Sequence, residues 1–425
     1  MSYLSDYILY NSGAETPEEY LHWGGLSILG HLLGNKVWIT HGDHFRFFPN
    51  LYICLVGDAG SGKNTALSLN KELMIETFTS LMISSNIQSR EDVAYQMASD
   101  DCIRVWKDAY GTLQSYRPFY ILNNELEAFL SVDQTKMIGF LVDVFDGKHF
   151  GTGFKSDRKA EPKKAQFFRN PHLSLLAGAV PTWFMGSLKM NLFSGGLGRR
   201  LIIVHAKRTK IIPDPRRPAG AGLALARIKE HLQTAHEYQG EIRRSPDALA
   251  WWNEWYINQK NNKPIDPILS QFHETEPMQL LKIALCLHMT ERPFAPLMPA
   301  EPLMMAAAML EATKPSIMAL TSGIGRNELA GVGVQLLDFI ARMGGMISEA
   351  TLRKHFYRFM RTAEFKDIEE NYIKSGELTI ARDPSTGLNL YFDKDGIGKY
   401  MAKKAAQQAA MMEALKKQEE VKKAL

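Results

Sequence analysis

The chain has 425 residues, of which 45% are hydrophobic and 23% are charged, and its formal net charge is +4 at pH 7. This composition excludes a disordered or fibrous protein, the length suits two or three domains, and the mild charge does not by itself indicate a polyanionic partner. Three widely spaced cysteines, no signal peptide and no apolar run long enough to span a bilayer predict a cytoplasmic protein with reduced thiols and no membrane contact.

The first predicted elements are a helix and two strands. Thr16-Pro17-Glu18-Glu19 combines a capping hydroxyl, a proline and first-turn acids, which is typical of a helix start, and Gly34 can end that helix. A strand is expected at residues 36–40. Residues 50–56 form a continuous apolar run, which is typical of a strand buried on both faces of a parallel sheet.

A glycine-rich loop follows this second strand at once: Gly57-Asp58-Ala59-Gly60-Ser61-Gly62-Lys63-Asn64-Thr65. A helix is predicted from residue 65 to 82, so strand, loop and helix stand in the order that a phosphate-binding loop requires. The glycines let backbone N–H groups converge on one point, the helix start adds partial positive charge, and Lys63 can reach the β- and γ-phosphates. The pattern predicts an ATP site with Mg²⁺; the alternative is a glycine-rich turn with a chance lysine.

Two amides stand where such a site usually places its magnesium ligands. The residue after Lys63 is normally Ser or Thr, and here it is Asn64. The apolar run 118–122 is followed by Asn123-Asn124-Glu125, so Asn124 occupies the position expected for an aspartate and Glu125 that of the carboxylate that positions the attacking water. We therefore expect nucleotide binding, with Asn64 and Asn124 at the metal and with slower hydrolysis. An ordinary strand end with a solvated glutamate is the alternative for Glu125.

Further apolar runs at 172–179 and 201–204 complete an α/β sheet with helices on both sides. Arg199 and Arg200 precede the last of these strands. In ring-shaped ATPases an arginine at this place reaches the γ-phosphate bound by the neighbouring subunit and stabilises the transition state. Surface arginines that merely flank a strand are the alternative.

A basic segment at residues 154–169 lies between the strands expected at 118–122 and 172–179 and is a candidate DNA-binding hairpin. Its cationic residues face few acids and suit a nucleic-acid backbone, although a solvated surface loop has a similar composition. The residues that we expect to contact DNA are Lys155, Arg158, Lys159, Lys163 and Lys164.

The C-terminal half is predicted to be mostly helical. Residues 222–321 have a helical pattern that is interrupted by loops around Pro264 and at residues 293–302. Residues 332–392 read as three short helices followed by two strands, which is the order of a winged-helix domain. The expected domains are an N-terminal helical segment (1–48), a P-loop ATPase core of the AAA+/RecA-like class (49–220), a helical region (221–328), a winged-helix-like domain (329–396) and a charged helical tail (397–425).

The order of several short motifs resembles that of AAA+-like ATPases from phage, plasmid and prophage primase–helicase proteins, in a domain long described as of unknown function. Each motif alone is weak, but together they run through most of the chain. Besides the glycine loop they are Pro49-Asn50-Leu51-Tyr52, Asn124-Glu125-Leu126, Val144-Phe145-Asp146-Gly147, the run from Asn170 to Pro181, Gly196-Leu197-Gly198-Arg199-Arg200 and Leu280-Leu281-Lys282-Ile283-Ala284.

This resemblance implies a homo-hexameric ATPase that is associated with DNA replication of a mobile element in a bacterial host cell. It also implies an accessory helical region and a C-terminal part, the winged-helix-like domain, that contacts DNA together with the basic segment. The leading hypothesis is a phage-type replicative helicase on single-stranded DNA, with Glu125 activating water and Arg199 or Arg200 acting in trans. No primase module is expected, so a separate primase or polymerase would be a partner. The strand ending at Ala179 also lacks a polar sensor residue. Two rivals remain: an initiator or helicase-loading ATPase, and a nucleotide-stabilised DNA-binding scaffold with slow hydrolysis.

Overall fold

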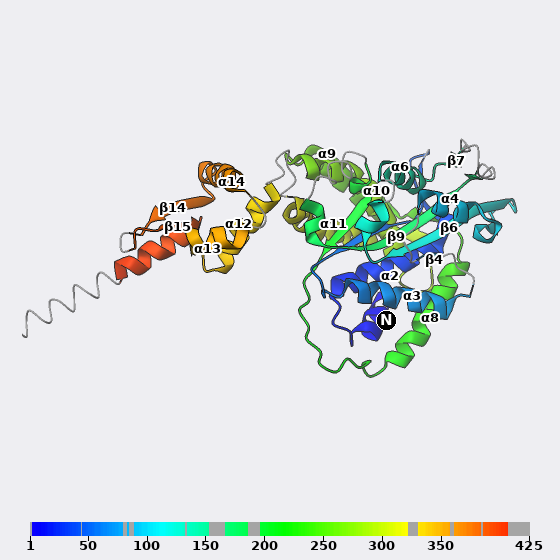
Figure 1. Cartoon of the computed structure of the whole chain (residues 1–425). Coiled ribbons are helices and arrows are strands. Elements are labelled where there is room, and N and C mark those ends of the chain that lie inside the picture. Colours follow the sequence, from blue (N-terminus) through cyan, green and yellow to red (C-terminus); the bar gives the residue numbers. More distant parts are fainter. Residues whose placement is uncertain are drawn as a thin grey trace, which may run out of the picture. The chain divides into compact units, whose positions relative to one another are not determined.

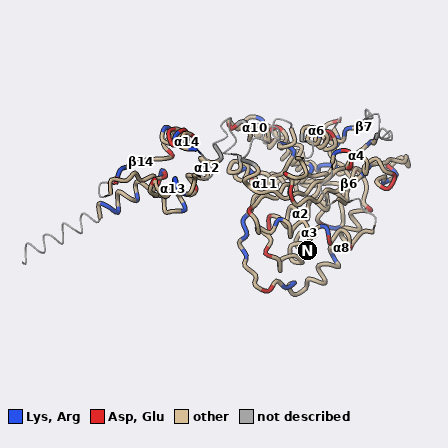
Figure 2. Tube along the Cα trace, viewed as in Figure 1, with Lys and Arg blue, Asp and Glu red and all other residues tan. Residues whose placement is uncertain are grey.

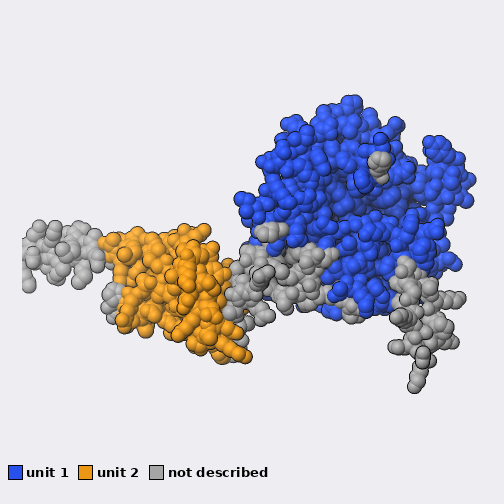
Figure 3. Space-filling model, turned by 90° about the horizontal axis from the view of Figure 1, so that it is seen from above, with its two compact units in different colours: residues 1–184, 188–321 blue, residues 185–187, 322–425 orange. Residues whose placement is uncertain are grey.

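The computed structural model describes residues 2–43, 45–79, 83–84, 89–131, 134–152, 166–185, 196–321, 330–357, 361–383 and 386–406. The chain divides into two compact units, shown in different colours in Figure 3. The first comprises residues 1–184 and 188–321, and the second comprises residues 185–187 and 322–425. The first unit is a mixed α/β structure built on a parallel sheet flanked by helices, as predicted at this level (Figure 1).

The central sheet has the strand order β10-β3-β9-β6-β4, and all four of these pairings are parallel. The antiparallel strand β5 extends it beside β6. The runs expected to be strands at 50–56, 118–122, 172–179 and 201–204 correspond to β3, β6, β9 and β10. The bounds are β3 Tyr52–Val56, β4 Ile83–Ser84, β5 Arg104–Lys107, β6 Leu113–Asn123, β9 Pro171–Ala179 and β10 Leu201–His205.

Helices cover both faces of this sheet, which explains why β3 and β9 are buried along their whole length. Ile53 and Leu55 belong to the core that also contains α2 and α3. Tyr52 points the other way, where its ring meets Phe145 at the end of α6. The remaining helices before β10 are α1, α4 and α5. The bounds are α1 Tyr3–Asn11, α2 Glu18–Leu33, α3 Lys63–Thr77, α4 Arg90–Ala98, α5 Leu126–Ser131 and α6 Gln134–Phe145.

A second sheet joins the N-terminal segment to the helical region. Its order is β12-β11-β1-β2, and β1 pairs in parallel with β11. The expected strand at 36–40 is β1. The helical pattern predicted for 222–321 is wrong at β11, which is short and depends on a distant partner, whereas β12 lies within the loop expected at residues 293–302. The bounds are β1 Val37–His41, β2 Phe45–Phe47, β11 Gly240–Arg244, β12 Leu297–Met298, α8 Ala221–Glu237, α9 Pro246–Asn261, α10 Pro267–His288 and α11 Ala300–Thr321.

One helix, α11, contains the only stretch of the described residues that is long and apolar enough to cross a membrane, residues 300–320. Buried helices of soluble proteins meet the same criterion, and α11 contributes Leu303, Ala306 and Leu310 to the main core. A single weak candidate of this kind does not indicate a membrane protein. The sequence had suggested no such stretch at all.

The described part of the second unit contains, besides a helical segment at its end, three helices and a three-stranded antiparallel sheet with the order β13-β15-β14. The three helices and both strands of the predicted hairpin are present, and β13 is an additional strand. Residues 396–406 are helical, and the rest of the predicted tail lies outside the described residues. The bounds are α12 Ala330–Arg342, α13 Glu349–Phe356, α14 Thr362–Lys374, β13 Met346–Ser348, β14 Leu378–Arg382 and β15 Asn389–Asp393.

Candidate nucleotide-binding site

A cavity of about 610 Å³ lies at the carboxyl ends of the central strands. It brings together the glycine loop after β3, the residues after β6 and the end of β9. Two further residues, Glu15 and Arg208, come from segments that the sequence did not associate with this site. The lining consists of Glu15, residues 59–65, residues 124–128, residues 178–180 and Arg208.

The glycine loop has the backbone conformation that its glycines permit. Gly60 and Gly62 have φ angles of 77° and 88°, in the left-handed region that favours glycine. Gly57 is required for a different reason, because a Cβ atom there would lie 2.6 Å from both the Tyr20 hydroxyl and Ser61 Oγ. The Tyr20 hydroxyl is 2.5 Å from the carbonyl oxygen of Val56, so α2 supports the base of the loop.

Lys63 is the first residue of α3, and its side chain folds back over the loop. Its ammonium donates hydrogen bonds to the carbonyl oxygen of Asp58 at 2.8 Å, to Ser61 Oγ at 3.2 Å and to the carbonyl oxygen of Gly57. Burial lowers the pKa of Lys63, although the nearby Asp58 opposes this effect. An anion in the cavity would therefore meet a cation that is already held by the loop and has lost part of its hydration.

Asn64 and Asn124 both line the cavity and are exposed to it. They approach each other across Gly178 of β9: a Cβ atom on Gly178 would lie 2.6 Å from the carbonyl oxygen of Asn124 and 3.7 Å from Asn64 Oδ1. Amide and carbonyl oxygens are acceptable Mg²⁺ ligands, so the donor set fits the metal. The described residues hold no cluster of three His, Cys, Asp or Glu side chains suited to a metal. Affinity would therefore depend on the nucleotide's own phosphate oxygens.

Glu125 follows β6 and also lines the cavity with an exposed side chain. Its position is fixed by the buried Asn123, whose Oδ1 accepts a hydrogen bond from the Glu125 N–H at 2.9 Å. Since β9 lies between β3 and β6, and neighbouring strands are about 4.8 Å apart, about 10 Å separates the two strand ends. The glycine loop and Glu125 therefore lie at the ends of two strands that are separated by one strand, and both line the cavity.

Arg199 and Arg200 lie in the turn before β10, and neither lines this cavity. Arg200 is buried and forms an ion pair with Asp146, with Arg200 Nη2 2.6 Å from Asp146 Oδ2. Arg199 is less buried, and its carbonyl oxygen accepts hydrogen bonds from Thr275 and Gln279 of α10. The Asp146 pair therefore holds the Arg200 side chain within the fold, whereas these hydrogen bonds of Arg199 involve its backbone carbonyl.

Alanine substitutions are expected to separate these two arginines. Arg200→Ala leaves the Asp146 carboxylate without its partner, so the free energy of unfolding should fall by about 2–4 kcal/mol. This is at the low end of what breaking a buried pair costs, because the Asp146 side chain is a quarter exposed. Arg199→Ala should change stability by less than about 1 kcal/mol. Urea denaturation of both variants provides the measurement. Equal stability of the two would contradict the assignment of Arg200 to the fold.

Glu15 and Arg208 are the two site residues that sequence reasoning missed. Arg208 Nη1 lies 2.5 Å from Glu15 Oε2, while Glu15 Oε1 accepts a hydrogen bond from the Ile212 N–H at 2.7 Å. The sequence holds one signal that could have pointed to Arg208, because five of residues 206–220 are Lys or Arg. Figure 2 shows these cations along the chain between β10 and α8. The position of Glu15 and Arg208 beside the glycine loop depends on the tertiary fold.

The predicted DNA-binding hairpin is described only at its base. Strands β7 (Phe150–Thr152) and β8 (Gln166–Phe168) pair antiparallel, and the Phe150 and Phe168 rings stack with centroids 5.2 Å apart. Residues 153–165 lie outside the described residues, and with them Lys155, Arg158, Lys159, Lys163 and Lys164.

Comparison with known proteins adds no family assignment. No protein-family model matches the chain, and no curated protein matches it at a significant level. The resemblance to phage primase–helicase ATPases therefore stays a hypothesis that rests on the motifs and on their order in the sequence.

Proposed function

We propose that this chain is an ATP-driven motor that acts on DNA, and that it is a phage-type replicative helicase working as a homo-hexameric ring. The observation that carries the proposal is the convergence of the glycine loop, Lys63 and Glu125 on one cavity at the ends of parallel strands. Those three features suit the binding of a triphosphate and the activation of a water molecule.

Each residue has a distinct part in the proposed reaction. Backbone N–H groups of the loop and the Lys63 ammonium bind the β- and γ-phosphates, and Glu125 orients the water and accepts its proton. Asn64 and Asn124 would hold Mg²⁺, which offsets the charge of the phosphates when it is bound. Arg199 of one subunit would complete the site of the next and stabilise charge in the transition state.

The strand order supports an AAA+-like P-loop core for this function. One strand, β9, separates the strand that leads into the glycine loop from the strand that ends at Glu125. This spacing suits a carboxylate that acts on a water molecule rather than directly on the phosphate.

The DNA contacts of the proposed motor are assigned mainly to the hairpin that begins at β7 and ends at β8. The three helices and small sheet of the second unit support a winged-helix-like domain. Its third helix, α14, however, carries four acids (Glu364, Asp367, Glu369 and Glu370) and two lysines (Lys366 and Lys374). That helix is poorly suited to a phosphate backbone, whereas the hairpin segment is cationic.

The function is tested by ATP hydrolysis with and without single-stranded DNA, together with strand displacement on a forked duplex. A helicase should show DNA-stimulated hydrolysis, ATP-dependent displacement and six-membered rings in electron micrographs. Hydrolysis without displacement would favour the initiator or loader. Hydrolysis that is indifferent to DNA would refute a DNA motor.

A slow-hydrolysing, DNA-binding scaffold is the second candidate, because neutral Asn64 and Asn124 face the cavity where charged or hydroxyl ligands are usual. Asn124→Asp is expected to raise the Mg²⁺-dependent turnover by about tenfold, since a carboxylate holds the metal more strongly than an amide does. Phosphate release at saturating ATP provides the measurement. The double variant Lys63→Ala/Asn124→Asp should stay inactive, and an unchanged rate in Asn124→Asp alone would show that residue 124 does not limit hydrolysis.

A further inference from the structure

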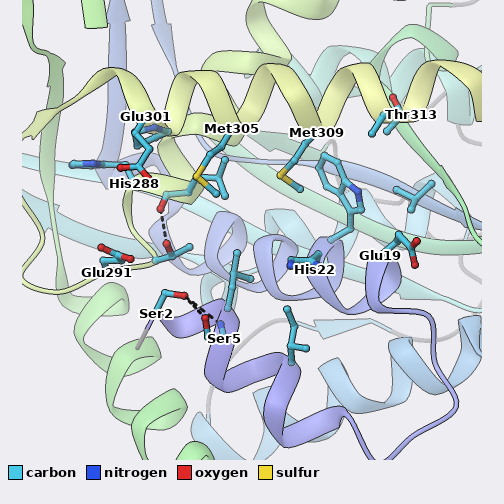
Figure 4. A pocket seen from close by; sticks show the side chains of 18 of the residues that line it. Ser2, Ser5, Glu19, His22, His288, Glu291, Glu301, Met305, Met309 and Thr313 are labelled. Atoms are coloured by element: carbon cyan, nitrogen blue, oxygen red, sulfur yellow. Dashed lines mark hydrogen bonds between the residues drawn. The ribbon is translucent and has the colours of Figure 1, made fainter. Parts of the chain in front are cut away.

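A second and larger cavity, of about 1060 Å³, lies in the first unit (Figure 4). It is bounded by α1, α2, the end of β10, the segment between α10 and α11, and α11 itself. None of the residues assigned to the nucleotide site lines it. We refer to this cavity as the α11 groove.

The shape of the α11 groove is set by one face of α11. Glu301, Met305, Met309 and Thr313 follow one another at intervals of four residues and point into the groove in Figure 4. At 1.5 Å per residue, this row spans about 18 Å. The opposite wall includes Trp23 of α2. A groove of this length matches about three turns of a helix and is larger than the usual cavity for a small molecule, which is about 300–1,000 Å³.

The floor of the groove is apolar and incompletely covered. Met305 is 47% exposed although it lines a concave surface. Thioether side chains adapt to varied partner surfaces and are common where amphipathic helices dock. The uncovered apolar face therefore suits the apolar side of another helix.

The charges around the groove are acidic. Glu19, Glu291 and Glu301 line it with exposed side chains, and none of them forms an ion pair with a described residue. Burial lowers the pKa of His288 in the same lining, which disfavours the charged form of this imidazole. Because the whole chain carries a net charge of +4, this negative rim is a local feature rather than a reflection of the overall charge.

We propose that the α11 groove binds an amphipathic helix of a partner protein, with an apolar stripe that contacts Met305, Met309 and Trp23 and with basic residues that face Glu19, Glu291 and Glu301. The length and apolar floor select a helix, and the three carboxylates select a basic one. The observations behind this proposal do not rest on the proposed ATPase activity, because no residue lines both cavities.

The test uses a fluorescein-labelled 15-residue peptide whose leucines follow helical i, i+3, i+4, i+7 spacing and whose other residues are lysine. Fluorescence anisotropy with the full-length chain should show saturable binding. Met305→Glu should raise the Kd at least about tenfold, because it places a charge in the apolar floor. Met304→Glu is the matched control: it alters the adjacent residue of α11, which is 52% exposed and does not line the groove, and should leave the Kd within about twofold.

Charge selection forms the second part of the test. Glu301→Lys should raise the Kd of the lysine peptide by up to about tenfold. It should not raise the Kd of a peptide in which glutamates replace the lysines. The proposal is overturned if both methionine variants bind alike, or if the glutamate peptide binds the unaltered chain as tightly as the lysine peptide. It is also overturned if Met305→Glu, and not Met304→Glu, abolishes self-association in sedimentation velocity, because the groove would then join two copies of this chain.

Discussion

Lys63→Ala is expected to lower kcat/KM for ATP by about 10²–10³-fold, the scale of losing one charged contact to the reacting phosphates. The Lys63 ammonium lies among three loop oxygens, and burial has already lowered its pKa, so much of its dehydration cost is met before a nucleotide binds. Phosphate release as a function of ATP concentration, with Mg²⁺ and single-stranded DNA, provides the measurement.

Lys71→Ala is the matched control for this substitution. Lys71 lies on the same helix, α3, but does not line the cavity, so its replacement should leave kcat/KM within about twofold. Circular dichroism of Lys63→Ala should show an intact fold, since the loop loses only its own hydrogen bonds. Full hydrolysis by a folded Lys63→Ala protein would remove the basis of the proposed triphosphate site.

Glu125→Gln is expected to abolish turnover while leaving nucleotide binding intact. The carboxylate contributes to proton transfer in the transition state, a role worth about 10²–10⁴-fold in kcat. Glutamine keeps the shape of the side chain, and the Asn123 hydrogen bond to the backbone of residue 125 is retained. The Kd of a fluorescent ATP analogue should therefore change by less than about threefold.

Glu127→Gln separates a specific role of Glu125 from a general effect of negative charge. Glu127 is exposed and lines the same cavity two residues later. If Glu125 positions the water, Glu127→Gln should retain most of the turnover. A loss confined to Glu127→Gln would transfer the role of base to that residue.

The elements that the sequence predicted correctly are those whose pattern lies within a few consecutive residues. The run 50–56 is apolar throughout because β3 is covered on both faces, and Gly60 and Gly62 are needed because of their positive φ angles. Strands β11, β12 and β13 were missed because they are short and their pairing partners lie far away in the chain. Their residues alone do not distinguish a strand from the helices around them.

The residues of the candidate site also divide into those predictable from their neighbours in the sequence and those that depend on distant partners. The loop and Glu125 each follow a buried strand, so their meeting at one sheet edge was predictable. Arg208 and Glu15 are 193 residues apart, and nothing in either segment indicates the other. The difference between Arg199 and Arg200 was likewise not predictable, because it depends on Asp146, which reaches Arg200 only in the folded protein.

Helix α2 supports the glycine loop from below and also lines the α11 groove. Tyr20 holds the strand end beneath the glycine loop, and its neighbours Glu19 and Trp23 line the α11 groove. Two ligands that bias one shared element are thermodynamically linked, and the linkage is reciprocal. Any factor by which ATP tightens the binding of a helix in the groove must equal the factor by which that helix tightens ATP. A partner protein would then report whether the chain has ATP bound without touching the nucleotide.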